Sequence, residues 1–430
     1  MRISSSQYFT MNVQAMDDQQ ATLATMYQQI ATGNKLQSAG DNPIGAAQAV
    51  QLTAQSATLA QYGANQASAT TSLGLEDSTM GSVVTTMQQI QTLVTSAGNG
   101  SLTDTNRANI ATQIQTLRTQ LLGLANTTDS SGNSIFSGFQ GNATTFTNNT
   151  PPAVGVSYGG DNGQRVVQIT SSRSVPVSDT GPAVFQSVSP TESTPVATQT
   201  AGNTGTGTLG PVSVTDPTNA GNADTYQIVF STAVPAPTTG SPLQYQVLDM
   251  SQMNPAATPP ALGLPVGSPT QYVPGNAITF AGESVTISGT PAPTDSFTVA
   301  PANSTAPGAT DIFATLDNLV AALNQPTTTP AEAAASTNAL ATATTKIENN
   351  YNNMLGVQTS VGGREQEVTA TQTSMQTTST QNANSLADLT SVDMASAISQ
   401  YELTSTALQG AQQAFASIEK MSLFQYISGS

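Results

Sequence analysis

The chain contains 430 residues, of which 37% are hydrophobic and 8% are charged, and it has neither cysteine nor histidine. These absences exclude disulfides, thiol nucleophiles and thiolate metal sites, and they remove the imidazole ring, the commonest general base and metal ligand. The net charge of -16 opposes binding to nucleic acid or to anionic lipid. We therefore expect no cofactor, no metal, no nucleic acid and no membrane partner. The sequence also lacks an apolar segment typical of a signal peptide or a membrane span.

Proline divides the sequence into three blocks. Of the 24 prolines, 21 lie between Pro151 and Pro307, and the other three are Pro43, Pro326 and Pro330. Because proline interrupts helices, the two flanking blocks can form long helices and the central block cannot. The predicted order is helical, non-helical, helical.

In the first block, apolar residues recur at spacings of three and four, the period of a helix packed along a partner. A break at Gly98-Asn-Gly100, followed by a capping sequence that ends at Asp104, predicts that the second and third helices form an antiparallel hairpin. The three stripes are Val13, Met16, Gln20, Leu23, Tyr27 and Ile30; Leu59, Tyr62, Gln66, Ala69, Leu73, Glu76, Met80, Val83, Met87, Ile90, Val94 and Ala97; and Ile110, Ile114, Leu117, Leu121 and Leu124.

The helical period resumes after Pro330. The stripes there are Ile347, Tyr351, Met354, Gln358 and Val361, and then Met394, Ala397, Tyr401, Thr404, Leu408, Ala411, Phe415 and Ile418. Neither terminal helix has an evident partner in its own block, so we expect each to pack against the other terminus or against neighbouring subunits. Gln, Thr and Ala interrupt these stripes, and a single pairing therefore buries little apolar area.

The central block has the pattern of β structure. Short alternating runs are separated by Gly, Pro, Asn and Asp. We expect the last two runs to form a hairpin across residues 289–294. The runs are 165–170, 225–230, 244–248, 277–280, 284–288 and 295–299.

One motif has the spacing of a hydrolase nucleophile elbow, Gly155-Val-Ser157-Tyr-Gly159. The chain has no histidine to accept the serine proton, and its lysines lie in the helical blocks. We interpret residues 155–160 as a turn and expect no catalytic residue and no enzyme activity.

The most informative motif ends one predicted helix and begins another. Gly33 can adopt positive φ as a C-cap, and Asp41 or Asn42 can cap the next helix with Pro43 in its first turn. These four residues form a predicted hinge between helices. The segment, Gln29-Ile-Ala-Thr-Gly-Asn-Lys-Leu-Gln-Ser-Ala-Gly-Asp-Asn-Pro-Ile-Gly-Ala-Ala47, closely resembles the one that follows the first helix of flagellins and flagellar hook-associated proteins.

Three further segments narrow this resemblance to the hook-filament junction family of the flagellin superfamily. They are Arg2-Ile-Ser-Ser-Ser-Gln7 at the start, Ser131-Gly-Asn-Ser-Ile-Phe-Ser-Gly-Phe139 after the third helix, and Phe280-Ala-Gly-Glu-Ser-Val-Thr-Ile-Ser-Gly-Thr-Pro291 in the centre. The stretch from Asp388 through Leu423 is similar to the closing helix of the superfamily. Asn42 stands where the family often has a second Asp, and Asn caps a helix about as well.

The resemblance implies an α+β multidomain fold, with a long helical coiled-coil-like rod built from both termini and an inserted β-rich outer domain. Residues 1–40 with 385–430 then form a terminal helical assembly domain, 41–140 with 311–384 a helical rod domain, and 141–310 the outer domain. The implied function is mechanical, an adaptor ring that joins hook to filament without catalysis.

The same resemblance implies the partners and the location. The chain is expected to form a ring of identical subunits, to adjoin another hook-associated protein and flagellin, and to be escorted by an export chaperone on its C-terminal region. It is expected in the extracellular flagellum, exported by the flagellar type III apparatus without a cleaved signal peptide. The predicted assembly residues, which we expect to become ordered on assembly, are Val13, Met16, Leu23, Tyr27, Ile30, Tyr401, Leu408, Phe415 and Ile418.

Two other functions remain open at this point. A flagellin that forms the filament itself shares the hinge and the terminal helices. A secreted adhesin with a Thr-rich central binding domain is the more distant alternative.

Overall fold

The computed structural model describes residues 5–141, 144–189, 193–232, 242–254, 261–306 and 308–427. The chain divides into two compact units. We call Met1–Asn65 with Ala370–Ser430 the terminal unit, and Gln66–Thr369 the body unit.

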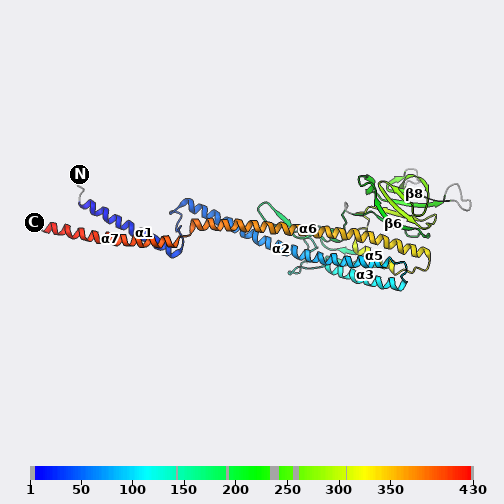
Figure 1. The fold of residues 1–430 in the computed structure, drawn as a ribbon, viewed down its shortest axis with the longest axis horizontal. Helices are drawn as coiled ribbons and strands as arrows, with labels where there is room; N and C mark the ends of the chain where they lie inside the picture. The colour runs from blue at the N-terminus through cyan, green and yellow to red at the C-terminus, as the bar shows by residue number, and fades with distance from the viewer. Residues whose placement is uncertain are drawn as a thin grey trace. The chain divides into compact units, whose positions relative to one another are not determined.

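Long helices from both ends of the sequence confirm the expected fold class (Figure 1). Among the described residues, no helix is both long and apolar enough to cross a membrane. The helices are α1 (Ser5–Thr32), α2 (Pro43–Ala97), α3 (Asp104–Ala125), α4 (Gly181–Phe185), the 3-10 helix η1 (Ala220–Ala223), α5 (Ile312–Leu323), α6 (Pro330–Thr390) and α7 (Met394–Ile427).

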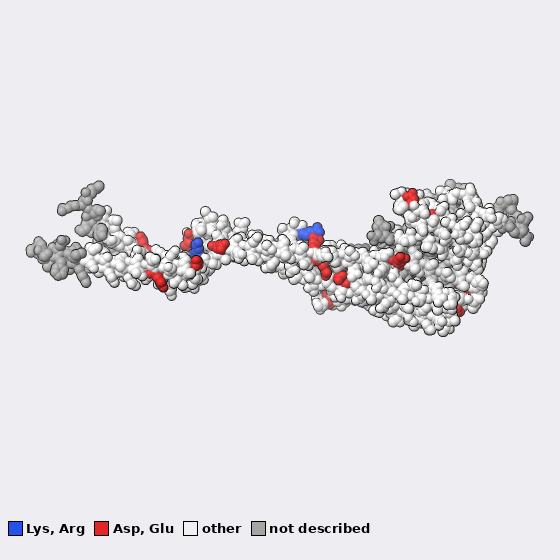
Figure 2. Space-filling view, viewed as in Figure 1, with Lys and Arg blue, Asp and Glu red and all other residues white. Residues whose placement is uncertain are grey.

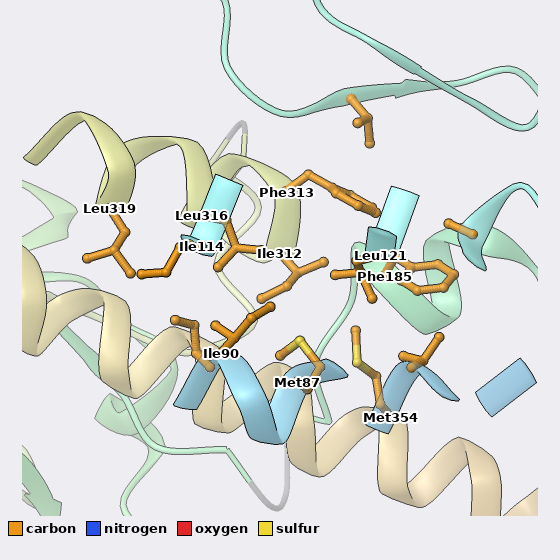
Figure 3. Packing of buried hydrophobic residues seen from close by; sticks show 14 of the residues in the cluster. Met87, Ile90, Ile114, Leu121, Phe185, Ile312, Phe313, Leu316, Leu319 and Met354 are labelled. Atoms are coloured by element: carbon orange, nitrogen blue, oxygen red, sulfur yellow. The ribbon is translucent and has the colours of Figure 1, made fainter. Parts of the chain in front are cut away.

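Helix α3 folds back on α2 as predicted. The chain turns within residues 98–103, and the Thr103 hydroxyl caps α3 by accepting the Asn106 N–H at 3.3 Å. Apolar side chains from α2, α3, α5 and α6 then share one core, in which Met87, Ile114 and Met354 are fully buried (Figure 3). The period of three and four in the sequence thus corresponds to this buried face.

The β-rich segment lies between α3 and α5 in the sequence. Its strands form two separate hairpins, β1-β2 and β3-β4, and two larger sheets of order β10-β11-β6 and β5-β12-β7-β8-β9. The strands are β1 (Phe146–Asn148), β2 (Val156–Tyr158), β3 (Val166–Gln168), β4 (Ser174–Pro176), β5 (Val196–Gln199), β6 (Thr208–Val214), β7 (Tyr226–Thr232), β8 (Leu243–Asn254), β9 (Ala261–Gln271), β10 (Ala277–Phe280), β11 (Glu283–Ser288) and β12 (Ser296–Ala300).

The two larger sheets enclose a second hydrophobic core and form a β-sandwich. Ile278 and Ile287 come from the three-stranded sheet, and Ile228, Phe230 and Phe297 from the five-stranded sheet. The small hairpins pack elsewhere: Phe146 and Val156 of β1 and β2 join the helical core, whereas Val175 of β4 joins Leu73 of α2 and Val361 of α6 in a third cluster. The sandwich is thus built from β5 to β12.

The predicted hairpin of residues 284–288 and 295–299 is wrong. Strand β11 pairs antiparallel with β10 and β6, whereas β12 pairs with β5 and β7 in the other sheet. Ala281 and Gly282 have φ of 43° and 82°, and this two-residue turn joins β10 directly to β11. The connection after β11 instead crosses between sheets, where the Asp295 carboxylate accepts backbone N–H groups from Thr204, Gly205 and Ala292.

The amide of Asn338 on α6 joins the helices to the sandwich. It accepts the Leu209 N–H of β6 at 2.7 Å and donates to the Gly207 carbonyl at 2.8 Å and to Gln199 Oε1 of β5 at 2.6 Å. Strands β5 and β6 are edge strands of the two sheets. Because edge strands leave backbone groups unpaired, this buried amide supplies partners that the ladders do not.

We expect Asn338→Ala to lower the free energy of unfolding by about 1–3 kcal/mol, because the buried Leu209 N–H loses its acceptor. Urea unfolding followed by circular dichroism measures this. Thr337→Ala, one residue earlier on the exposed side of α6, is the matched control and should change stability much less. Equal effects of the two substitutions would contradict the assigned role of Asn338.

Candidate assembly surfaces

Helices α1 and α7, from opposite ends of the chain, pack against each other in the terminal unit. The rings of Phe9 and Phe415 are in contact, with centroids 5.0 Å apart. The sequence is compatible with pairing of each terminal helix with the other terminus or with neighbouring subunits. The structure shows the first pairing within a single chain.

The predicted assembly residues fall into three groups by exposure. Leu408 is buried, at 8% exposure, and it is the one buried hydrophobic side chain among those described in the terminal unit. Tyr27 and Ile418 are exposed, at 65% and 44%. The remaining residues are half-buried: Val13, Met16, Leu23, Ile30, Tyr401 and Phe415.

Several large apolar side chains of the terminal unit are exposed although the predicted stripes omit them. Ile44 is 74% exposed and Leu403 is 71% exposed. A stripe of apolar residues at helical spacing identifies the side of a helix that packs against its partner. It therefore does not identify apolar residues on the other sides of the helix. These additional exposed residues are Phe9, Met11, Ile44, Val50, Ile398 and Leu403.

The hinge connects α1 to α2 and pairs with the connection between α6 and α7. Helix α1 ends at Thr32, and Gly33 follows with φ of 69°, a conformation that favours glycine. The Lys35 N–H donates to the Thr390 carbonyl at 2.7 Å, and the Val392 N–H donates to the Gly33 carbonyl at 3.0 Å. The two connections of the terminal unit therefore hold each other in place through backbone hydrogen bonds.

Asp41 and Asn42 have different roles in this hinge. Asn42 caps α2, because its side-chain oxygen accepts the Gly45 N–H at 3.0 Å, and Pro43 is the first helical residue. The Asp41 carboxylate instead accepts the N–H groups of Ser38 and Gln37. The hydrogen bond from the Ser38 backbone, the largest contribution, lowers the pKa of Asp41 below its usual value. Asp41 thus shapes the turn that precedes the helix.

Asp393 is a capping residue that the sequence analysis did not single out. Its carboxylate accepts the N–H groups of Ala395 and Ser396 at the start of α7. An Asp immediately before an apolar helical stripe is a standard helix-start signal and could have identified it.

Ser157 is not in a nucleophile elbow, and the interpretation of residues 155–160 as a turn is wrong. Ser157 lies within strand β2, paired with Thr147 of β1, and no helix follows directly. Its exposed hydroxyl donates to Asn149 Oδ1 at 2.5 Å. The site therefore lacks the strand-turn-helix geometry that exposes a hydrolase serine.

Charged side chains are sparse on the face of the molecule shown in Figure 2. Within the described ranges, no group of three or more Asp or Glu side chains could hold a metal ion. In α1 the charged residues are Asp17 and Asp18, and in α7 they are Glu402, Glu419 and Lys420. The other residues of these two helices are apolar or uncharged polar residues.

Comparison with known proteins agrees with this architecture. Residues 3–141 match the family described as the bacterial flagellin N-terminal helical region. Flagellar hook-associated protein 3 of Salmonella typhimurium is 35% identical over 188 residues, which cover 44% of this chain and 58% of that protein. The match thus spans less than two thirds of that relative.

Solved structures extend the similarity over more of the chain. The structure of flagellar hook-associated protein 3 from Legionella pneumophila matches with a TM-score of 0.67 and 28% identity, covering 79% of this chain and 98% of that one. The FlgL structure from Xanthomonas campestris matches with a TM-score of 0.64 and 26% identity, covering 77% and 98% of the two chains.

The helical termini, the connection between α1 and α2 and these matches make the chain similar to members of the flagellin superfamily. Within that superfamily it is similar to the hook-filament junction proteins, the hook-associated protein 3 group, as the hinge and the three further motifs predict.

Proposed function

We propose that this chain is a structural subunit of the bacterial flagellum that joins the hook to the filament. The similarity to hook-associated protein 3, at 35% identity over 188 residues, carries the assignment. The exposed apolar residues of the terminal unit support it, because a monomer gains nothing from leaving such side chains in water.

The packing of the terminal unit supports the proposal that partner subunits cover part of it. Helices of 28 and 34 residues pack together, yet Leu408 is the one hydrophobic side chain buried among the described residues of this unit. Burying one exposed leucine contributes about 1.5–3 kcal/mol. Covering Leu403, Ile44 and Tyr27 with neighbouring subunits would therefore stabilise an assembly considerably. Both the half-buried predicted residues and the exposed ones belong to this proposed assembly surface.

The finer parts of the proposal follow the family resemblance. Identical subunits form a ring that adjoins another hook-associated protein and flagellin. The terminal helices form an assembly domain, the following helices a rod, and the β-rich centre an outer domain. The chain acts outside the cell in the flagellum, after type III export with a chaperone bound to its C-terminal region. Its role is mechanical and no reaction is catalysed.

A filament-forming flagellin is the second candidate, because it shares the terminal helices and the hinge. The similarity to hook-associated protein 3 over most of the chain favours the junction role.

Immunogold electron microscopy with an antibody against the β-sandwich, residues 193–300, distinguishes these functions. We expect label in one narrow band where the hook meets the filament. Label along the whole filament would make the chain a flagellin, and label away from flagella would contradict a flagellar role. Cells that lack the gene serve as the staining control.

A further inference from the structure

Two cavities adjoin Lys346 of α6 within the body unit. One, of about 400 Å³, lies between α5, α6 and residues 198–203. The other, of about 370 Å³, lies between strands β5 and β12 and residues 300–309. Thr198, Asn318 and Lys346 line both cavities. These three side chains therefore border both spaces.

Lys346 has no carboxylate among the residues that line either cavity. In the described part of the chain, the ion pairs are made by Arg107, Arg118, Arg173 and Arg364. The side chain of Lys346 is partly buried, and this burial lowers its pKa. An ammonium group in such a place has lost part of its hydration without gaining an anion.

The walls of the larger cavity differ in polarity. Leu319 of α5 and three alanines of α6, Ala335, Ala339 and Ala343, provide apolar surface. Asn318 is exposed on α5, and its amide adds hydrogen-bond donors beside Lys346. Ligand sites commonly combine an apolar lining with a few polar groups, in cavities of about 300–1,000 Å³.

We infer that Lys346 and Asn318 form a binding site for a small organic monocarboxylate whose apolar part occupies the cavity of about 400 Å³ between α5 and α6. The carboxylate accepts hydrogen bonds from the Lys346 ammonium and the Asn318 amide. The apolar part contacts Leu319 and the alanines of α6. This site is separate from the proposed assembly surface. The ligand-binding experiment therefore tests the site independently of the proposed role in assembly.

The charges favour a monocarboxylate over a phosphate. One ammonium neutralises one negative charge, whereas phosphate sites usually combine several cationic or backbone donors. The net charge of -16 repels polyanions. At physiological salt this long-range repulsion is screened beyond about 8 Å, so a single negative charge can still reach the ammonium.

The chain has three lysines, Lys35, Lys346 and Lys420, which makes a direct test simple. Protein labelled with ¹³C at the lysine ε-carbons gives one NMR signal per lysine, assigned by substitution. We expect sodium benzoate to shift the Lys346 signal saturably and to raise the pH at which it titrates, while the Lys35 signal stays unchanged. Benzamide, which has the same shape without the charge, and sodium chloride at equal ionic strength should not shift it.

Two variants test the residues that we assign to the site. Lys346→Met should weaken benzoate binding at least about tenfold, and Asn318→Ala several-fold, as expected when a hydrogen bond to a charged group is lost. Benzoate binding by Asn318→Ala is followed through the NMR signal of Lys346. Binding by Lys346→Met is followed through the benzoate proton signals. Lys35→Met is the matched control and should bind as the unmodified chain does. Asn318 is exposed, so its substitution keeps the test valid if Lys346→Met fails to fold.

Three results would contradict the proposed binding site. They are no saturable shift of Lys346 with benzoate, an equal shift with benzamide or chloride, and unchanged affinity in both variants. A Lys346 shift that grows with protein concentration without benzoate would assign the carboxylate to a second copy of the chain and would also overturn a small-ligand site.

Discussion

Replacing Leu403 by aspartate is expected to leave the chain folded and to abolish its assembly. Leu403 is 71% exposed on α7, so in a single chain the new carboxylate is in water. Where a neighbouring subunit covers this position, about 1.5–3 kcal/mol of leucine burial is lost and an unpaired charge is desolvated. We expect unchanged circular dichroism, and loss of swimming in soft agar when the variant replaces the native chain.

Two further substitutions separate assembly from folding. Leu408→Asp places the charge at the buried position of α7, so we expect it to block assembly and also to destabilise the terminal helices. Val166→Asp changes an apolar residue that is 61% exposed in the body unit and serves as the matched control with normal swimming. Normal swimming with Leu403→Asp, at normal levels of exported protein, would show that this position is not in an interface.

Glu76 is expected to make the body unit more stable at mildly acidic pH than at pH 8. Its side chain is buried on α2, Oε1 accepts the Asp179 N–H at 2.8 Å, and Oε2 has no hydrogen-bond partner in the described structure. Burial, and secondly the negative charge of Asp179, raise the pKa of Glu76 to about 7, while Arg364, ion-paired with Asp179, opposes this shift. The folded chain therefore holds this proton more tightly than the unfolded chain.

The sign follows from the two pKa values, about 7 when folded and 4.5 when unfolded. Between them the folded state carries the proton and the unfolded state does not, so the free energy of unfolding falls as pH rises. The stabilisation is complete below pH 4.5 and is lost as pH passes through 7. The difference between the two pKa values corresponds to about 3 kcal/mol.

Glu76→Gln removes this dependence while keeping an oxygen that accepts the Asp179 N–H. We expect the variant to be more stable than the unmodified chain at pH 8, and the difference to shrink towards pH 5. Urea unfolding at several pH values, followed by circular dichroism, measures both. Glu348→Gln, the same change at an exposed position of α6, is the matched control. Identical pH profiles for the Glu76 variant and the unmodified chain would contradict this assignment.

The buried polar residues of the α2 stripe show what sequence periodicity misses. Gln66 and Glu76 occupy stripe positions and interrupt an otherwise apolar pattern. Both are buried because the β3-β4 segment packs over α2: Gln66 donates to the Ile169 carbonyl at 2.9 Å, and Glu76 accepts from Asp179. These partners are about a hundred residues away along the chain, so no local pattern predicts them.

The sequence alone predicts the long helices, the connection between α1 and α2 and the resemblance to the flagellin superfamily. Helical period, proline placement and capping residues act over a few neighbouring residues, and the hinge at Gly33 to Pro43 is a contiguous motif. Tertiary structure alone decided that β11 pairs with β10 and β6, that Ser157 lies in a strand, and which terminal apolar residues stay exposed. Each of these features depends on which segments, distant in the sequence, pack together. The pattern of apolar and polar residues along one strand or helix does not specify the segment that it packs against.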